Sequence, residues 1–384
     1  MLSIRRGDPA DRPEGEASTR PYGMSPFFRM HDTSISQGTA ENGTWTFVSK
    51  FASDGTFQWV RAWGPCSGSG MDVDNSGNVF VTGGFYEAVD FNPDPVEENW
   101  LYPEGEVDAF VLRMDNGGDY HWAENWGTAC GYDIAGDESG SLYVTGLFEE
   151  KVDFNPGDGI EEHTSNGDYD VFLSKLDDSG DFQWARTWGS DNEGREDLGK
   201  GVAVDIAGNI YVTGQFWESA DFDPGPGEET LIAATLEYDV FVSKFDSSGG
   251  FVWARNWGGI SPYVGPVQNI GYDVAVDAIG DVYVTGEVMG TCDFDPGPGV
   301  DEQECDPYDA PFLSKFTSTG TYLWARNWGH GWGFGVASDA GGNIHMCGFA
   351  CGLGGDDVDM DAGEGEDIWP GGAFVLRMLP DGSY

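Results

Sequence analysis

Residues 271–297 read GYDVAVDAIGDVYVTGEVMGTCDFDPG, with two short alternating apolar runs, a glycine turn between them and an acidic turn after them. Alternation with period 2 is typical of β-strands, and glycine supplies the positive φ that a tight hairpin requires. Near-copies of the stretch occur at residues 71–94, 132–157, 201–225 and 335–363. The sequence therefore predicts a β-hairpin that recurs along the chain.

A second repeated block, such as FVSKFDSSGGFVWARNWG at 241–258, lies between these copies and predicts another hairpin. Each unit then has four strands, which we name a (as in 271–277), b (281–288), c (239–245) and d (251–257). The tryptophans that open the d motif recur roughly every 60 to 70 residues, at Trp59, Trp122, Trp184, Trp253 and Trp324. A four-stranded antiparallel sheet at that spacing predicts an all-β protein, a β-propeller built from four-stranded blades.

The strand count tests whether such a ring closes. Strands a, b and d each occur five times and strand c six times. We expect five blades, with the N-terminal d strand, 57–63, completing the last blade. The surplus c strand leaves six or seven blades as the expectation if the chain is a fragment of a longer propeller.

The chain divides into two parts. Residues 1–44 are rich in Pro, Gly, Ser and Arg without apolar periodicity, so we expect a poorly ordered N-terminal tail. Residues 45–384 form the propeller. Its repeat units lie near 47–110, 110–172, 172–241, 241–312 and 312–374.

Charge limits the range of partners. The chain has 67 acidic and 18 basic residues, a net charge of −49, which repels nucleic acid and favours cations or basic partners. No apolar run is long enough to span a bilayer, so we expect no membrane insertion. The start, MLSIRRGDPADRPEGE, has a basic pair but no apolar core, so the sequence as given shows no signal peptide.

The blocks GYDVAVDAIGDVYVTG, DFDPGPG and FVSKFDSSGGFVWARNWGG resemble the bacterial β-propeller repeat family known as SBBP repeats, over roughly residues 45–384. The family name implies seven blades, and this chain departs from it with five units. The resemblance implies a propeller within a large secreted or cell-surface protein, and it supplies no catalytic residues. We therefore expect an extracellular or cell-surface location.

Antiparallel connectivity assigns the loops to two faces. The a–b and c–d turns, which are short and uniform, lie at one end of each blade, and the long b–c and d–a connections lie at the other. Because long loops on a rigid scaffold usually carry function, we expect a protein or carbohydrate partner at the b–c/d–a face.

An acidic turn opens each b–c loop. Oxygen ligands at i and i+2 followed by glycine suit Ca²⁺, although the ligand count of a calcium loop is incomplete. The alternative is an Asx turn in which aspartate caps backbone amides while the phenylalanine fills the blade. The candidate calcium ligands are Asp90, Asn92, Asp94, Asp153, Asn155, Asp221, Asp223, Asp293, Asp295, Asp359 and Asp361.

Four tryptophans outside the repeated motif, in or beside the long connections, could stack on a sugar, and the alternative is loop packing. They are Trp100, Trp217, Trp332 and Trp369. Lysines and arginines that recur in strands c and d suggest either an anion site or ion pairs with turn aspartates of the same sheet, and recurrence in every unit favours the ion pairs.

The six cysteines suggest three candidate disulfides, with buried free thiols as the alternative. The candidate pairs are Cys292 with Cys305, Cys347 with Cys351, and Cys66 with Cys130.

No motif for a nucleophile, a phosphate loop or a zinc helix occurs, and the acids repeat from unit to unit. We therefore expect a non-enzymatic extracellular β-propeller, a binding or scaffold module with calcium as a candidate stabilising ion and no other cofactor. The alternative is a carbohydrate-binding lectin or a glycoside-active enzyme that uses the long-loop face. Asp72 stands where other a strands have alanine, and the sequence does not explain it.

Overall fold

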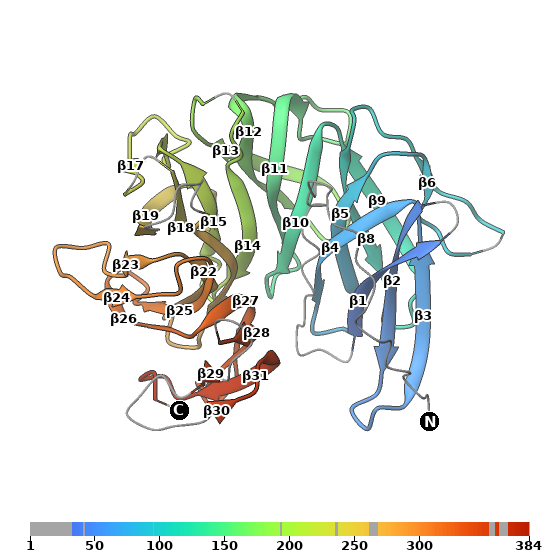
Figure 1. The fold of residues 1–384 in the computed structure, drawn as a ribbon. Coiled ribbons are helices and arrows are strands. Elements are labelled where there is room, and N and C mark those ends of the chain that lie inside the picture. Colours follow the sequence, from blue (N-terminus) through green and yellow to red (C-terminus); the bar gives the residue numbers. More distant parts are fainter. Residues whose placement is uncertain are drawn as a thin grey trace, which may run out of the picture.

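The computed structural model describes residues 33–40, 43–94, 96–192, 194–234, 237–260, 268–352, 358–360 and 368–383. In these residues all regular secondary structure is β-strand, and no helix occurs among them that could cross a membrane. The sheets follow one another around an arc from the N-terminal to the C-terminal end (Figure 1). The prediction of an all-β chain of antiparallel four-stranded sheets is confirmed.

Four sheets have the predicted a–b–c–d strand order, and every neighbouring pair of strands is antiparallel. The first two sheets contain β4 (Cys66–Val73), β5 (Val79–Phe85), β8 (Asp108–Met114) and β9 (Tyr120–Trp126), then β10 (Ala129–Gly136), β11 (Leu142–Asp153), β12 (Glu162–Leu176) and β13 (Phe182–Trp188). The next two contain β14 (Leu198–Val204), β15 (Ile210–Trp217), β18 (Tyr238–Phe245) and β19 (Phe251–Trp257), then β21 (Ile270–Val276), β22 (Val282–Val288), β25 (Ala310–Phe316) and β26 (Tyr322–Asn327).

A three-stranded sheet lies at each end of the arc. The N-terminal sheet contains β1 (Thr33–Ala40), β2 (Gly43–Phe51) and β3 (Phe57–Trp63), and the C-terminal sheet contains β27 (His330–Ser338), β28 (Ile344–Cys351) and β31 (Gly372–Met378). The structure therefore describes six such sheets, and residues 33–40, expected in the tail, pair with β2 as a strand.

The expected completion of the last sheet by residues 57–63 is not found. This segment, β3, pairs with β2 across a tight turn in which Gly55 donates its amide to the carbonyl of Ala52. Closing a short hairpin loop costs less conformational entropy than bringing the two ends of the chain together. The pairing of β3 with the neighbouring strand β2 is therefore favoured. Among the described strands, β31 pairs only with β28.

The long b–c connections form small hairpins of their own. These are β6 (Val89–Asp90) with β7 (Trp100–Leu101), β16 (Ser219–Asp221) with β17 (Thr230–Ile232), β23 (Thr291–Asp293) with β24 (Glu302–Glu304) beside β20 (Gly259–Ile260), and β29 (Val358–Asp359) with β30 (Ile368–Trp369). In the second four-stranded sheet the hairpin is continuous with β11 and β12.

The hydrophobic core consists of separate layers, one between each pair of consecutive sheets. The second tryptophan of each d motif enters the layer ahead of it. Trp63, for example, packs with Phe85 and Phe91 of the following sheet and donates its indole N–H to the carbonyl of Phe91 (2.7 Å). The repeated aromatic residues thus join the sheets.

The first tryptophan of each d motif makes a second contact between sheets. Trp253 lies against Gly320, a residue with φ +75° in the c–d turn of the next sheet, and donates its indole N–H to the carbonyl of Ser318 (3.2 Å). We call this contact the tryptophan–glycine clasp. The other tryptophan–glycine pairs are Trp59 with Gly118, Trp122 with Gly180, Trp184 with Gly249, and Trp324 with Gly382.

Lysines and arginines of strands c and d reinforce the clasp. Arg255 donates from Nε to the carbonyl of Gly320 (3.0 Å), and Lys244 donates to that of Ser318 (3.0 Å). The expectation that these cations pair chiefly with aspartates of their own sheet is wrong at these positions, because the partners are backbone carbonyls of the next sheet. Lys315 does pair with an aspartate of its own sheet, Asp281 (2.8 Å).

The innermost strands, β4, β10, β14, β21 and β27, lie side by side and show an alternation that the repeat hides. At one shared register position they carry Gly70, Asp133, Gly201, Asp273 and Gly335. Asp133 and Asp273 each accept a backbone amide from the next inner strand, at 2.9 Å. A Cβ added to Gly70 would lie 2.5 Å from the Cα of Asp133, so glycine is required beside each aspartate.

Two glycine substitutions test the clasp. Gly320→Ala places a Cβ 2.8 Å from the Trp253 ring, whereas Gly55→Ala, in an equivalent turn with φ +81°, meets nothing within 4 Å. Both variants strain the backbone by about 1–2 kcal/mol, and Gly320→Ala is expected to cost about 1–3 kcal/mol more. Urea unfolding measures the difference. Equal losses of stability would show that the clasp contributes nothing.

Candidate functional site

The acidic turns of the long-loop face are nested Asx turns. In the turn after β16, Asp221 Oδ1 accepts the amides of Asp223 (3.1 Å) and Glu229 (2.8 Å), and Asp223 Oδ1 accepts the amide of Gly225 (2.8 Å). The first aspartate of three other turns likewise accepts two backbone amides on its Oδ1 atom. These residues are Asp90, Asp153 and Asp293. The carboxylates therefore order the turns through the backbone.

The phenylalanine of each acidic turn explains why the turn recurs. Phe222 is fully buried and packs against Trp188 of the preceding sheet, with ring centroids 6.3 Å apart. Phe91, Phe154 and Phe294 are buried equivalently, and Met360 replaces the phenylalanine in the last unit. The acidic residue thus fixes a turn that inserts an aromatic ring between two sheets.

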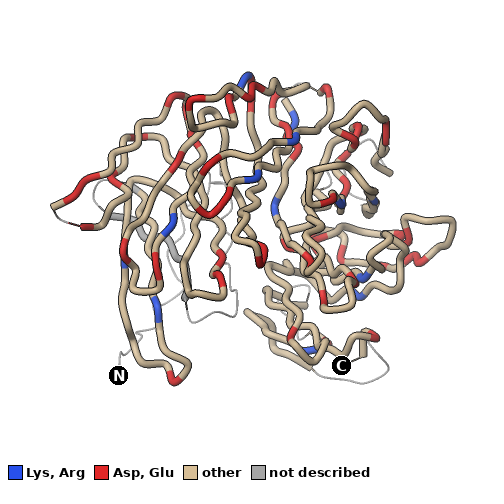
Figure 2. Tube along the Cα trace, turned by 180° about the vertical axis from the view of Figure 1, so that it is seen from behind, with Lys and Arg blue, Asp and Glu red and all other residues tan. Residues whose placement is uncertain are grey.

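Calcium binding at these turns stays a prediction. Asp90, Asn92, Asp94, Asp153, Asn155, Asp293, Asp295 and Asp359 lie in or beside the small hairpins, as do Asp221 and Asp223, whereas Asp361 lies outside the described residues. Within the described ranges, no three His, Cys, Asp or Glu side chains gather as a metal-binding group. Most loops nevertheless carry acidic residues (Figure 2).

The four candidate tryptophans lie in four different sheets. Trp217 is buried, with the Tyr238 ring 4.8 Å and the Arg195 guanidinium 3.9 Å from it, so it packs a loop. Trp332 lies in β27 beside Phe334, with ring centroids 6.2 Å apart. Trp100 and Trp369 are 47% and 42% exposed, on β7 and β30, the second strands of equivalent hairpins. Of the four candidate tryptophans, only these two are exposed.

No disulfide joins the six cysteines, all of which lie in described parts of the chain. Cys347 and Cys351 share strand β28, four residues apart, which is about 13 Å and too far for a disulfide. Burial raises the pKa of the Cys66 and Cys130 thiols to about 11 and that of Cys305 to about 12, so these side chains are protonated at neutral pH.

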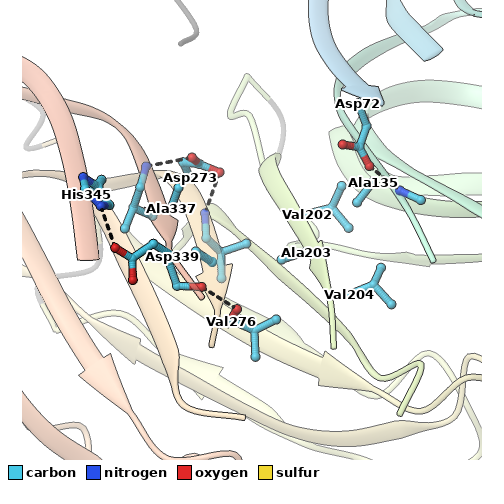
Figure 3. Close-up of a pocket in the computed structure, with 15 residues that line it drawn as sticks. Asp72, Ala135, Val202, Ala203, Val204, Asp273, Val276, Ala337, Asp339 and His345 are labelled. Atoms are coloured by element: carbon cyan, nitrogen blue, oxygen red, sulfur yellow. Dashed lines mark hydrogen bonds and ion pairs between the residues drawn. The ribbon is translucent and has the colours of Figure 1, made fainter. Parts of the chain in front are cut away.

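A cavity of about 460 Å³ lies where the five inner strands converge near the a–b turns (Figure 3). Its wall is mainly valine and alanine from β10, β14, β21 and β27. Its polar groups come from β4, from β21, from the end of β27 and from β28. The residues that matter below are Asp72, Asp273, Ser338, Asp339 and His345. The sequence pointed to the opposite face, because long loops are conspicuous and a cavity formed by small residues is not.

The polar groups of the cavity are held by hydrogen bonds across the inner strands. Asp72 accepts the amide of Gly136 (2.7 Å), which accounts for the aspartate that the sequence left unexplained. Ser338 donates to the carbonyl of Val276 (3.0 Å), and a ring nitrogen of His345 lies 3.3 Å from Asp339.

The other end of the inner strands is filled by bulged residues. Each inner strand has one extra residue, and four of these are Tyr132, Lys200, Tyr272 and Phe334. Lys200 lies 3.3 Å from the centre of the Tyr132 ring, and the Tyr272 and Phe334 ring centroids are 6.0 Å apart. These side chains pack together across the inner strands.

A pair of buried carboxyls lies within β12 and directly before β14. Asp170 and Asp197 are each 1% exposed, and a Cβ on Gly189 would lie within 3 Å of both. Burial raises the pKa of Asp170 to about 7, with a further contribution from Asp197, whose own pKa burial raises to about 6. Because neither carboxyl is exposed, this pair cannot serve as the two acids of a glycosidase.

Repeated four-stranded antiparallel sheets joined by aromatic layers are the arrangement that β-propeller blades have. Residues 184–215, from strand d through strands a and b, match the family model of the SBBP beta-propeller repeat, which confirms the resemblance to the SBBP repeat family. No curated protein matches the chain. A solved structure of a protein of unknown function from Bacteroides caccae is similar at 12% identity and a TM-score of 0.34, covering 77% of this chain and 82% of that one.

The buried pair makes stability depend on pH. The folded-state pKa of Asp170 lies above the unfolded value, so its favourable contribution is present below about pH 4 and is lost as the pH rises through about 7. Asp170→Asn removes this titration. We expect the variant to be more stable than the wild type at pH 8, by on the order of 2 kcal/mol, and to show a flatter pH dependence.

Melting temperatures at pH 5 and pH 8 check this. Asp119→Asn is the control, because the Asp119 side chain is 81% exposed and the same chemical change there should leave the pH dependence unaltered. An unchanged slope in Asp170→Asn would contradict the assignment.

Proposed function

We propose that the chain is a non-enzymatic, extracellular β-propeller module that binds a protein or carbohydrate partner on its long-loop face. The observation that carries the proposal is the clasp, which repeats at five junctions and joins the sheets at the short-turn end. The long connections take no part in the clasp. Beyond the buried phenylalanine of each acidic turn they can therefore vary and bind partners without weakening the scaffold.

The six sheets are proposed as blades of one propeller. This is one of the sizes expected for a longer ring, in place of the five blades that the strand count favoured. Support comes from the inner strands, which succeed one another from β4 to β27 around a common cavity.

A scaffold role also agrees with the distribution of acidic residues. The aspartates of the acidic turns recur in each unit and serve the backbone, as at Asp221 and Asp293. A catalytic site would require carboxyls in one unit that the others lack and that substrate can reach. Asp197 is specific to one unit but is inaccessible, and Asp170 is buried at a position that two other units share as Asp108 and Asp239. An extracellular location is supported by the family resemblance.

The proposal predicts no hydrolysis of glycosides. Chromogenic glycosides of common hexoses and pentoses, assayed at pH 5 and pH 7, should show no turnover above that of a heat-denatured sample. Turnover lost on substitution of a single carboxylate would overturn the non-enzymatic assignment and favour the glycoside-active alternative.

The lectin alternative rests on the exposed Trp100 and Trp369. If sugars stack there, replacing both by alanine should weaken binding to a polysaccharide panel by at least about tenfold, because stacking on an aromatic ring contributes about 1–2 kcal/mol. Val252→Ala, an exposed apolar residue on β19, is the control and should bind normally. Retained binding in the double variant would exclude these tryptophans as a sugar platform.

Stabilisation by bound calcium is the alternative to a purely structural role for the acidic turns, and its contribution is measurable. Because backbone amides already engage Asp221 Oδ1 and its counterparts, we expect a chelator such as EGTA to leave the melting temperature unchanged. A fall of several degrees that added Ca²⁺ reverses would instead show that calcium holds the turns together.

A further inference from the structure

The central cavity is where the units stop being equivalent. The inner-strand position that faces it carries Ala135, Ala203, Ala275 and Ala337 in four units and Asp72 in the first. Nothing in the repeat requires a carboxylate here, since four units fold without one. The aspartate is therefore a feature of this cavity and not of the blade.

A second exception faces the same space. Opposite those alanines, strand b carries Tyr143, Tyr211 and Tyr283, whose hydroxyls donate to the aspartate of the a–b turn at 3.0 to 3.1 Å. The last unit has His345 at this position, and its ring lines the cavity beside Asp339. The replacements at residues 72 and 345 come from the first and last inner units and lie at one cavity (Figure 3).

The side chains that line the cavity favour some classes of ligand over others. Val204 and Val276 offer partly exposed aliphatic surface, and none of the described residues that line the cavity is a lysine or an arginine. Asp273 and Asp339 use their carboxylate oxygens in hydrogen bonds to backbone amides and to side chains of the last unit. A hard metal ion needs six or more oxygen ligands, which this largely aliphatic wall does not provide.

We propose that the cavity binds a small organic cation, an ammonium compound with a short aliphatic body, with Asp72 as its counter-ion. The ammonium group pairs with the carboxylate while the aliphatic part covers the valines. The volume of about 460 Å³ lies within the range of small-molecule sites. The negative charge of the whole chain, −49, raises the local concentration of such a cation. This site is separate from partner binding at the long-loop face.

The test uses the full chain and two pairs of probes that match in shape and differ in charge. Isopentylamine is compared with isopentanol, and choline with 3,3-dimethylbutanol, by isothermal titration calorimetry at pH 7.5. We expect at least one of the cations to bind in the micromolar to millimolar range. The neutral isostere of that cation should bind at least about tenfold more weakly, because it cannot pair with a carboxylate.

Variants locate the site. Asp72→Asn keeps the acceptor for the Gly136 amide and removes the charge, and it should weaken binding of the cation by at least about tenfold. Asp72→Ala installs the residue of the other units and should do the same, with its folding checked by the melting temperature. Glu138→Gln is the control, because Glu138 is exposed on the a–b turn of the next sheet and its loss tests the overall charge alone.

Three results would overturn the proposal. They are the absence of binding by both cations, equal binding of a cation and its neutral isostere, and equal affinity of Asp72→Asn and the wild type. Failure of the long-loop face to bind a partner would leave these measurements unaffected, so the two proposals fail separately.

Discussion

The fold depends on an aromatic ring held over a glycine across each sheet junction. A strand of one sheet brings the tryptophan, and the c–d turn of the next sheet brings a glycine with positive φ, as at Trp253 and Gly320. A side chain at that glycine would push the ring away, and any other ring would lack the indole N–H that reaches the turn carbonyl. The c–d turn therefore has two roles. It joins two strands of its own sheet, and it fixes the distance to the preceding sheet through the tryptophan that packs on its glycine.

A second layer of contacts lies at the opposite end of the sheets and works differently. There the acidic turns orient a buried phenylalanine, and the charge of the aspartates is used to order backbone amides. The acidity of this face is thus in large part a by-product of turn formation. This explains how a chain with so many carboxylates can be a scaffold, and it separates the repeated acids from the unit-specific Asp72.

The repeat could be recognised from the sequence because strand alternation and turn glycines are local signals. The four-stranded units, the aromatic layers and the alternative of an Asx turn at the acidic loops were accessible for the same reason. The partners of Arg255 and Lys244 were not, since the aspartates of their own sheet are near in sequence, whereas the carbonyls of the next sheet are about 65 to 75 residues away. The cavity was missed because small residues such as Ala203 carry no chemical signal. The strand at residues 33–40 was missed because its composition resembles that of the preceding segment, and only pairing with β2 defines it.

The alternation of glycine and aspartate on the inner strands constrains how such a protein can grow. An aspartate such as Asp273 needs a neighbour without a side chain, because a Cβ at Gly201 would lie 2.8 Å from its Cα. Duplication of a single unit would place two identical residues at neighbouring inner-strand positions. Two adjacent aspartates would clash, and two adjacent glycines would lack the carboxylate that accepts an amide from the next strand. Copying two adjacent units preserves the order. The unit whose duplication preserves the alternation is therefore a pair of adjacent sheets, and gain or loss of sheets in steps of two keeps each aspartate beside a glycine.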